Sequence, residues 1–153
     1  MGVVKNKRIG DDVVYTLAGN LDAAAAHHYF DLNYRDYHEI GDAIGVIIDL
    51  RAMERLTVAG LRVAQQRMSG VVFDTPVAFV GNPDSILLAF LSILEGLSSR
   101  TRSRFAFFRE GEDPIADAVA WVGAWYEQHG IDREARRGRI TAAPTPPPAS
   151  EAG

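Results

Sequence analysis

The chain has 153 residues, of which 47% are hydrophobic, so it can bury one core of good size but is too short for two ordinary domains. Its formal net charge of -4 and its scattered Lys and Arg residues argue against nucleic-acid binding. Because cysteine is absent, disulfides, thiolate zinc sites and a cysteine nucleophile are excluded, and we expect a cytoplasmic protein.

The first elements predicted along the chain are a hairpin and a long helix. Residues 3–9 and 13–17 are short β-prone runs separated by a Gly-Asp-Asp turn, and the Lys and Arg residues of the first run are typical of an edge strand. A stretch without Pro or Gly follows, which predicts a helix with Asp22 as its N-cap and Gly41 as its stop.

The central stretch, residues 46–63, reads VIIDLRAMERLTVAGLRV. Its apolar, β-branched start predicts a strand that is buried on both faces and ends at Asp49 and Leu50. We interpret the next six residues as a short loop, and Thr57 as the N-cap of a helix that runs to about Met68. Ligands and regulatory groups in α/β proteins tend to lie at such a junction.

Two further strands and two further helices are predicted in the rest of the domain. Residues 76–80 and 105–108 have the composition of strands. Residues 85–97 predict a helix that is apolar around most of its circumference, although its longest apolar region, about 12 residues, is shorter than the roughly 20 residues needed to span a bilayer. Pro114 begins a closing amphipathic helix that ends near Gly130.

The composition changes after residue 130. An Arg-rich start is followed by Ala, Thr, Ser and four prolines between residues 144 and 148. Such a segment buries too little apolar area to offset the entropy of ordering it. We therefore predict one domain over residues 1–130 and a disordered Arg/Pro/Ala-rich tail over residues 131–153, whose removal leaves the fold intact.

The order of elements is ββαβαβαβα, and with IIDL at residues 47–50 and LTVAGL at residues 56–61 it resembles the STAS domain of anti-sigma factor antagonists. The segments PVAFVGNPDS and FREGEDPIADAVAWV are similar to the SpoIIAA-like branch, which is sometimes grouped with CRAL-TRIO lipid-binding domains. The resemblance covers residues 3–128. It implies an α/β fold with a central mixed sheet of about five strands and about four helices, and a non-enzymatic regulatory module for signalling by protein binding.

The resemblance also implies a site. In the antagonists a Ser in a D-S-S-G-L segment at the start of the second helix is phosphorylated by a partner kinase that is also the anti-sigma factor. Here Ala59 stands at the phosphorylated position, so the usual switch is lost, and Thr57 is the alternative phosphoacceptor. The expected partner is a protein, such as an anti-sigma factor or a kinase-like regulator. The implied partner-binding residues are Glu54, Arg55, Thr57, Val58, Ala59, Gly60 and Arg62.

Two alternatives involve the apolar helix. The CRAL-TRIO likeness implies a carrier of a lipid or another small apolar ligand, and an exposed apolar stripe of this size is also typical of a homodimer contact. The residues that carry both alternatives are Ile86, Leu87, Phe90 and Leu91.

Other candidate sites have little pattern behind them. His27 and Asp31 share a helix face and form half of a metal site, but nothing completes it, so we expect no metal. Asp49 and Glu54 flank the loop after the central strand as an acid/base pair without a nucleophile. The glycines match no nucleotide-binding motif. We therefore expect no enzymatic activity and no cofactor.

Overall fold

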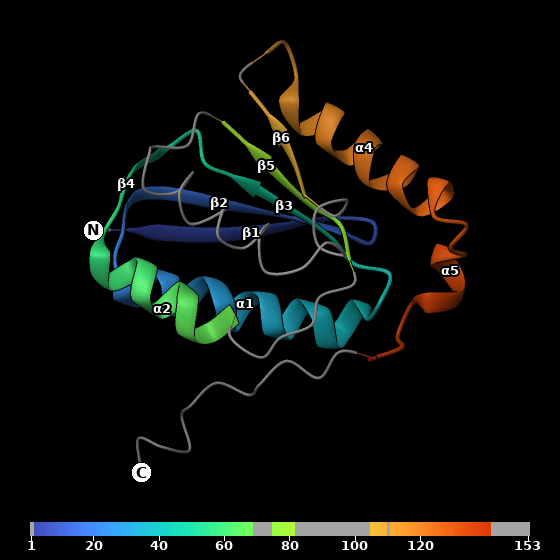
Figure 1. Ribbon diagram of the computed structural model, residues 1–153, viewed down its shortest axis with the longest axis horizontal. Coiled ribbons are helices and arrows are strands. Elements are labelled where there is room, and N and C mark those ends of the chain that lie inside the picture. The colour runs from blue at the N-terminus through green and yellow to red at the C-terminus, as the bar shows by residue number, and fades with distance from the viewer. Residues whose placement is uncertain (1, 69–74, 82–104, 110, 142–153) are drawn as a thin grey trace.

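A computed structural model describes residues 2–68, 75–81, 105–109 and 111–141 (Figure 1). The strands are β1 (Val3–Ile9), β2 (Asp12–Leu21), β3 (Gly45–Asp49), β4 (Met53–Leu56), β5 (Val77–Val80) and β6 (Phe105–Phe108). The helices are α1 (Ala23–Ile40), α2 (Val58–Met68), α4 (Pro114–Gln128) and α5 (Arg133–Arg136). The predicted helix over residues 85–97 lies outside the described residues.

The strands form one mixed sheet in the order β1-β2-β3-β5-β6. β1 is antiparallel to β2, and the register that joins Ile9 to Asp12 confirms the predicted hairpin and edge strand. Its turn contains Gly10, whose φ of 64° lies in the left-handed region that glycine adopts without strain. The pairs β2–β3, β3–β5 and β5–β6 are all parallel, so the predicted mixed α/β architecture is confirmed.

One strand was missed by the sequence interpretation, which takes residues 51–56 as a loop. Residues 53–56 form β4, which pairs in parallel with the end of β2, with Asn20 opposite Arg55 and Leu21 opposite Leu56. This short segment becomes a strand because β2 is long enough to extend beyond its pairing with β3. Its residues, MERL, show no alternation of apolar and polar side chains that predicts a strand.

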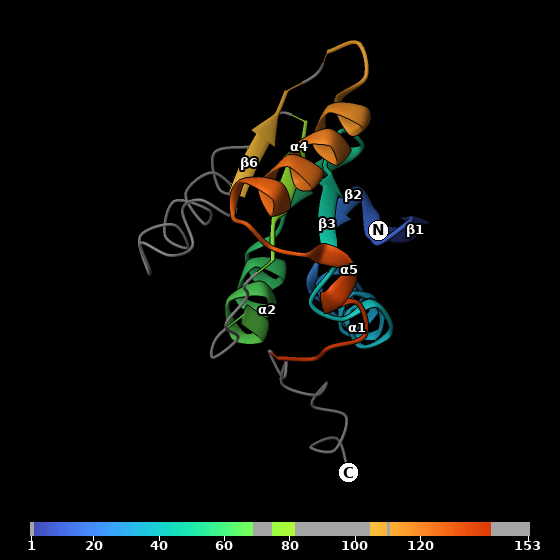
Figure 2. The same cartoon turned by 90° about the vertical axis from the view of Figure 1, so that its right-hand side faces the viewer.

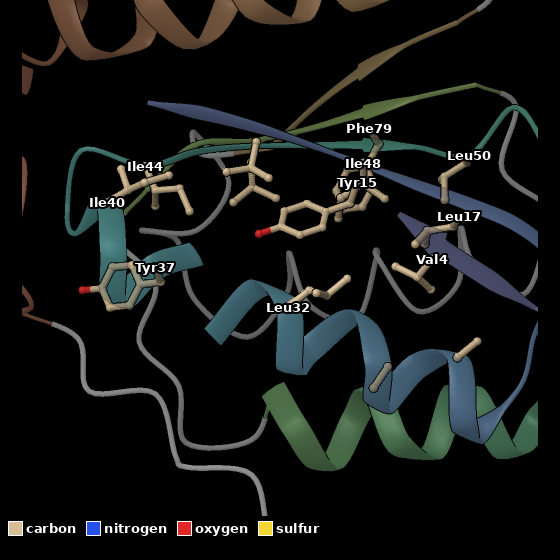
Figure 3. Close-up of a cluster of buried hydrophobic side chains, with 14 of the residues drawn as sticks. Val4, Tyr15, Leu17, Leu32, Tyr37, Ile40, Ile44, Ile48, Leu50 and Phe79 are labelled. Atoms are coloured by element: carbon tan, nitrogen blue, oxygen red, sulfur yellow. The ribbon is translucent and has the colours of Figure 1, made fainter. Parts of the chain in front are cut away.

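Helices cover both faces of the sheet. Figure 1 shows α1 and α2 together on one side and α4 on the other. Val46 and Ile48 of β3 belong to the core cluster on the α1 side, part of which is drawn in Figure 3, whereas Ile47 belongs to the cluster formed with α4. The prediction that this strand is buried on both faces is therefore confirmed.

The helix ends follow the predicted capping residues. The Asp22 carboxylate accepts a hydrogen bond from the Ala25 amide, and Gly41 ends α1 with a φ of 83°. Asp113 caps α4, and Pro114 occupies its first turn. None of the described helices combines the length and the apolar character that crossing a membrane requires.

The first part of the predicted tail is placed on the domain. Residues 131–141 include α5 and run along the amino-terminal ends of β2 and β3, where Arg133 pairs with Asp12 and Arg137 pairs with Asp11. These ion pairs join residues more than 100 positions apart, which the local composition of the segment does not reveal. The disorder expected from composition therefore does not describe residues 131–141. The domain boundary itself stays a prediction, since residues 142–153 lie outside the described part.

Candidate functional site

The first turn of α2 is fixed to the carboxyl-terminal end of β2. The Leu21 carbonyl accepts hydrogen bonds from the Thr57 amide, at 3.1 Å, and from the Thr57 hydroxyl, at 3.3 Å. The Thr57 hydroxyl oxygen also accepts a hydrogen bond from the Gly60 amide at 3.0 Å. Thr57 is therefore the N-cap of α2, as predicted, and it anchors the helix start to the sheet.

Gly60 is required by the close approach of α2 to β2. A Cβ atom at this position would overlap the Leu21 carbonyl oxygen and lie 3.0 Å from the Leu21 carbonyl carbon, and both are backbone atoms that cannot turn away. Gly60 is accordingly buried. Gly60, one of the two residues by which the segment matches the antagonist motif, thus has a structural role in this chain.

The predicted partner-binding residues lie together on β4 and the first two turns of α2, and we call them the α2 N-terminal surface. Glu54, Arg55, Ala59 and Arg62 are exposed, Thr57 is partly buried, and Gly60 lies beneath the surface. Val58 is 63% exposed and sits on the same helix face as Arg62, four residues later. The structure therefore brings the predicted residues together and presents five of the seven to solvent.

The charges of this surface are unpaired within the described part of the chain. Glu54, Arg55 and Arg62 make no ion pair or side-chain hydrogen bond there. Within the described ranges, no ion pair or side-chain hydrogen bond of these three residues has to break before a partner binds.

The structure also bears on the phosphoacceptor prediction. Ala59 is exposed at the start of the helix and carries no hydroxyl group. The Thr57 hydroxyl is engaged both as donor and as acceptor, so a phosphate there would remove the donor and crowd the Leu21 carbonyl. The N-cap role of Thr57 is confirmed, and its phosphorylation stays a prediction.

Asp49 is held by a residue that the sequence interpretation missed. Arg51 donates from Nε and from a terminal nitrogen to the two carboxylate oxygens of Asp49, each at 2.9 Å. Burial would raise the pKa of Asp49, but the hydrogen bonds from Arg51 outweigh it and lower that pKa below its ordinary value. Asp49 is thus ionised, and its negative charge is balanced by Arg51. Glu54 is exposed, so the two carboxylates do not share a proton. The D-x-R spacing is the sequence signal for this pair.

His27 and Asp31 both contact an arginine of α2. Arg67 of α2 donates to Asp31 at 2.9 Å and to the Nδ1 atom of His27 at 3.2 Å, and its guanidinium lies 5.5 Å from the centre of the Phe30 ring. In the described ranges, no three His, Cys, Asp or Glu residues are grouped so that they could hold a metal ion. Arg67, which the sequence reasoning did not single out, therefore fastens α2 to α1.

The candidate apolar surface is not placed by the structure. Ile86, Leu87, Phe90 and Leu91 lie outside the described residues, so the carrier and homodimer interpretations stay predictions.

No family model matches the chain, and no curated protein matches it. Among solved structures, it is similar to an anti-sigma factor antagonist from Mycobacterium paratuberculosis, with a TM-score of 0.52 and 18% identity over 80% of this chain and 95% of the other. It is also similar to a DUF3478-family protein with a SpoIIAA-like fold from Shewanella loihica, with a TM-score of 0.54 and 16% identity over 79% and 93% of the two chains.

A third structure, the anti-sigma factor antagonist SpoIIAA in its unphosphorylated form, gives a TM-score of 0.48 and 14% identity over 77% of this chain and 98% of the other. The first two similarities agree with the resemblance found in the sequence and with the observed mixed sheet. The chain therefore has the SpoIIAA-like fold.

Proposed function

We propose that this protein is a non-enzymatic regulatory module that binds a protein partner through the α2 N-terminal surface. The observation that carries the proposal is the exposure of Val58, 63%, in the first turn of a helix whose position is fixed by Thr57 and Gly60. Val58 is an exposed apolar side chain near three charged residues that form no ion pair with any residue that the structure describes. An apolar centre with a polar rim is the composition of a small protein interface.

The charges of this surface contrast with four carboxylates elsewhere in the domain. The carboxylates of Asp11, Asp12, Asp36 and Asp49 are each paired with an arginine, whereas Glu54, Arg55 and Arg62 are unpaired among the described residues. Charges at the rim of an interface chiefly set the association rate and the choice of partner. These three side chains therefore give the surface its selectivity, with Val58 as the apolar anchor.

The proposed partner is an anti-sigma factor or a kinase-like regulator in the cytoplasm. Two observations support this class: one of the similar solved structures is an anti-sigma factor antagonist, and the TVAGL segment resembles the antagonist motif. Because Ala59 cannot accept phosphate, the complex forms without the switch that the family resemblance implies. Thr57 remains the alternative acceptor, and phosphate there would introduce about two negative charges beside Val58.

Photocrosslinking in the native host tests this proposal. A photoreactive benzophenone amino acid is introduced at position 58 in one variant and at position 127 in another. Glu127 is a matched control, because it is exposed on α4, on the other side of the sheet. The expected result is one defined crosslinked protein of the regulatory class from position 58, and its loss when Arg62→Glu is added.

Two outcomes would contradict the proposal. Equal crosslinking from positions 58 and 127 would show that contacts at Val58 are not specific. A variant that is expressed and folded but gives no adduct at position 58 would show that the α2 N-terminal surface binds no protein. Phosphopeptide mapping of the natural protein from the same cells reports whether Thr57 carries phosphate.

A further inference from the structure

Residues 131–141 bind the amino-terminal ends of β2 and β3 through polar contacts, and we call this segment the C-terminal latch. Arg137 donates to the Asp11 carboxylate from Nε at 2.9 Å and from a terminal nitrogen at 2.6 Å. Arg133 pairs with Asp12, and the Thr141 hydroxyl donates to Asp42. Three carboxylates of the domain therefore hold three side chains of the latch.

The loop between α1 and β3 is shaped to receive the latch backbone. The Gly138 amide donates to the Ile40 carbonyl at 2.7 Å, and the Asp42 amide donates to the Arg139 carbonyl at 2.7 Å. Gly41 lies between these bonds, and a Cβ atom there would come within 2.6 Å of the Arg139 carbonyl oxygen. The latch backbone is therefore held in a defined position against this loop. Figure 2 shows α5 beside the end of α1.

The apolar core is almost independent of the latch. None of the residues of α5 is buried, and Ile131 is the one hydrophobic residue of the latch that packs against a core cluster of the described chain. Tyr126 of α4 donates its hydroxyl hydrogen bonds to the carbonyls of Asp42 and Ile44, at 3.1 and 2.6 Å, and needs no latch residue to do so. Opening the latch therefore breaks ion pairs and hydrogen bonds, and it removes Ile131 and the Arg133 guanidinium, which lies 4.7 Å from the centre of the Tyr126 ring, from the edge of this cluster. The remaining residues of both core clusters belong to the sheet, to α1, α2 and α4, and to the loops that flank β3.

We propose that the C-terminal latch is a salt-sensitive device that opens as a unit, pivoting near Gly130, while the rest of the domain stays folded. Gly130 suits a pivot, because its φ of 63° is accessible to glycine without strain and no atoms crowd the position of its missing Cβ. The Arg137–Asp11 pair is exposed and is weakened by screening, since the Debye length falls from about 10 Å at 0.1 M salt to about 3 Å at 1 M, whereas the partly buried Arg133–Asp12 pair is screened less. Opening uncovers an acidic surface made by Asp11, Asp12 and Asp42.

Amide hydrogen exchange of the full chain, resolved by NMR, tests the latch. The reporters are the amides of Asp42 and Gly138, which make the two backbone bonds to the latch, and the amide of Ile47 in the middle of β3 reports the core. Between about 0.1 M and 1 M salt we expect exchange at Asp42 and Gly138 to accelerate at least about tenfold, with Ile47 unchanged.

Two variants sharpen the test. Arg137→Ala removes one latch ion pair and should accelerate Asp42 and Gly138 at low salt. Arg139→Ala is the matched control, because Arg139 is an exposed latch arginine whose side chain makes no ion pair among the described residues, and it should leave both rates unchanged. Exchanging the charges, with Asp11→Arg and Arg137→Asp together, should restore protection.

The proposal is overturned by either of two results. If Ile47 accelerates together with Asp42 and Gly138, the latch opens only when the whole domain unfolds. If neither latch amide responds to salt or to Arg137→Ala, the ion pairs do not control opening.

Discussion

The two ends of the sheet differ in whether their charged residues form ion pairs. At the amino-terminal ends of β2 and β3, Asp11 and Asp12 are paired with Arg137 and Arg133 of the latch. At the carboxyl-terminal end of β2, where α2 begins, the charges of the α2 N-terminal surface are unpaired among the described residues and surround the exposed Val58. Both regions contain several arginines, so composition does not separate them. The first end therefore ties the carboxyl-terminal segment to the sheet, and the second is the end that we propose binds a partner.

Truncation of the chain gives the largest expected effect on stability, and it tests the contribution of the latch contacts at the amino-terminal ends of β2 and β3. A chain that ends after Thr141 should keep its free energy of unfolding within about 0.5 kcal/mol of the full chain, since the latch contacts remain. A chain that ends after Gly130 should stay folded but lose roughly 3 kcal/mol, because the buried Asp12 carboxylate loses Arg133. Urea unfolding measures the free energy of unfolding of the three chains. Equal stability of all three would show that residues 131–141 do not stabilise the domain.

Substitution of Gly60 tests the close contact between α2 and β2. Gly60→Ala should lower the free energy of unfolding by about 1–3 kcal/mol, because its new methyl group meets the Leu21 carbonyl. Gly123→Ala is the matched control: no atoms crowd its Cβ position inside α4, so it should stabilise the protein by up to about 1 kcal/mol. Thermal unfolding compares the pair. A neutral Gly60→Ala would mean that α2 shifts readily on β2.

The N-cap of α2 gives a smaller effect. Thr57→Ala should cost about 1 kcal/mol, whereas Thr57→Ser, which keeps the hydroxyl group, should cost little. Chemical denaturation of both variants measures the difference. If the two substitutions cost the same, the methyl group of Thr57 matters rather than its hydrogen bonds.

The smallest effect depends on pH. The hydrogen bonds from Arg137 lower the pKa of Asp11 in the folded protein. A carboxylate with a lowered folded pKa adds stability that is present above its unfolded pKa of about 3.9 and is lost as the pH falls through the folded value. Arg137→Ala should therefore be less stable than the natural protein at pH 7, and the difference should vanish in acid. A difference that persists at pH 2 would assign the effect to packing rather than to charge.

Local patterns predicted most of the fold. A few neighbouring residues were enough to predict the hairpin turn at Gly10, the caps at Asp22 and Thr57, and the burial of β3 on both faces. The structure confirms all of them. β4 was missed, because a four-residue strand depends on a partner more than 30 positions earlier. The latch was missed for the same physical reason.

The residues of the candidate site were also identified from the sequence, and their role in binding stays a prediction. The family resemblance located the α2 N-terminal surface, and the structure places its residues together. The roles of Arg51 and Arg67 were not predicted. Arg67 acts across two helices, which no local pattern reports, whereas Arg51 follows Asp49 by two residues and was open to prediction from the D-x-R spacing.

The most direct test of the account is the affinity of the partner identified by crosslinking for three purified chains: the natural protein, Val58→Asp and the control Glu127→Lys. If the α2 N-terminal surface is the binding site, Val58→Asp should raise the dissociation constant at least about tenfold, which corresponds to about 1.4 kcal/mol, and Glu127→Lys should leave it unchanged. Tight binding of the Val58→Asp chain, with its fold intact, would contradict the proposed site.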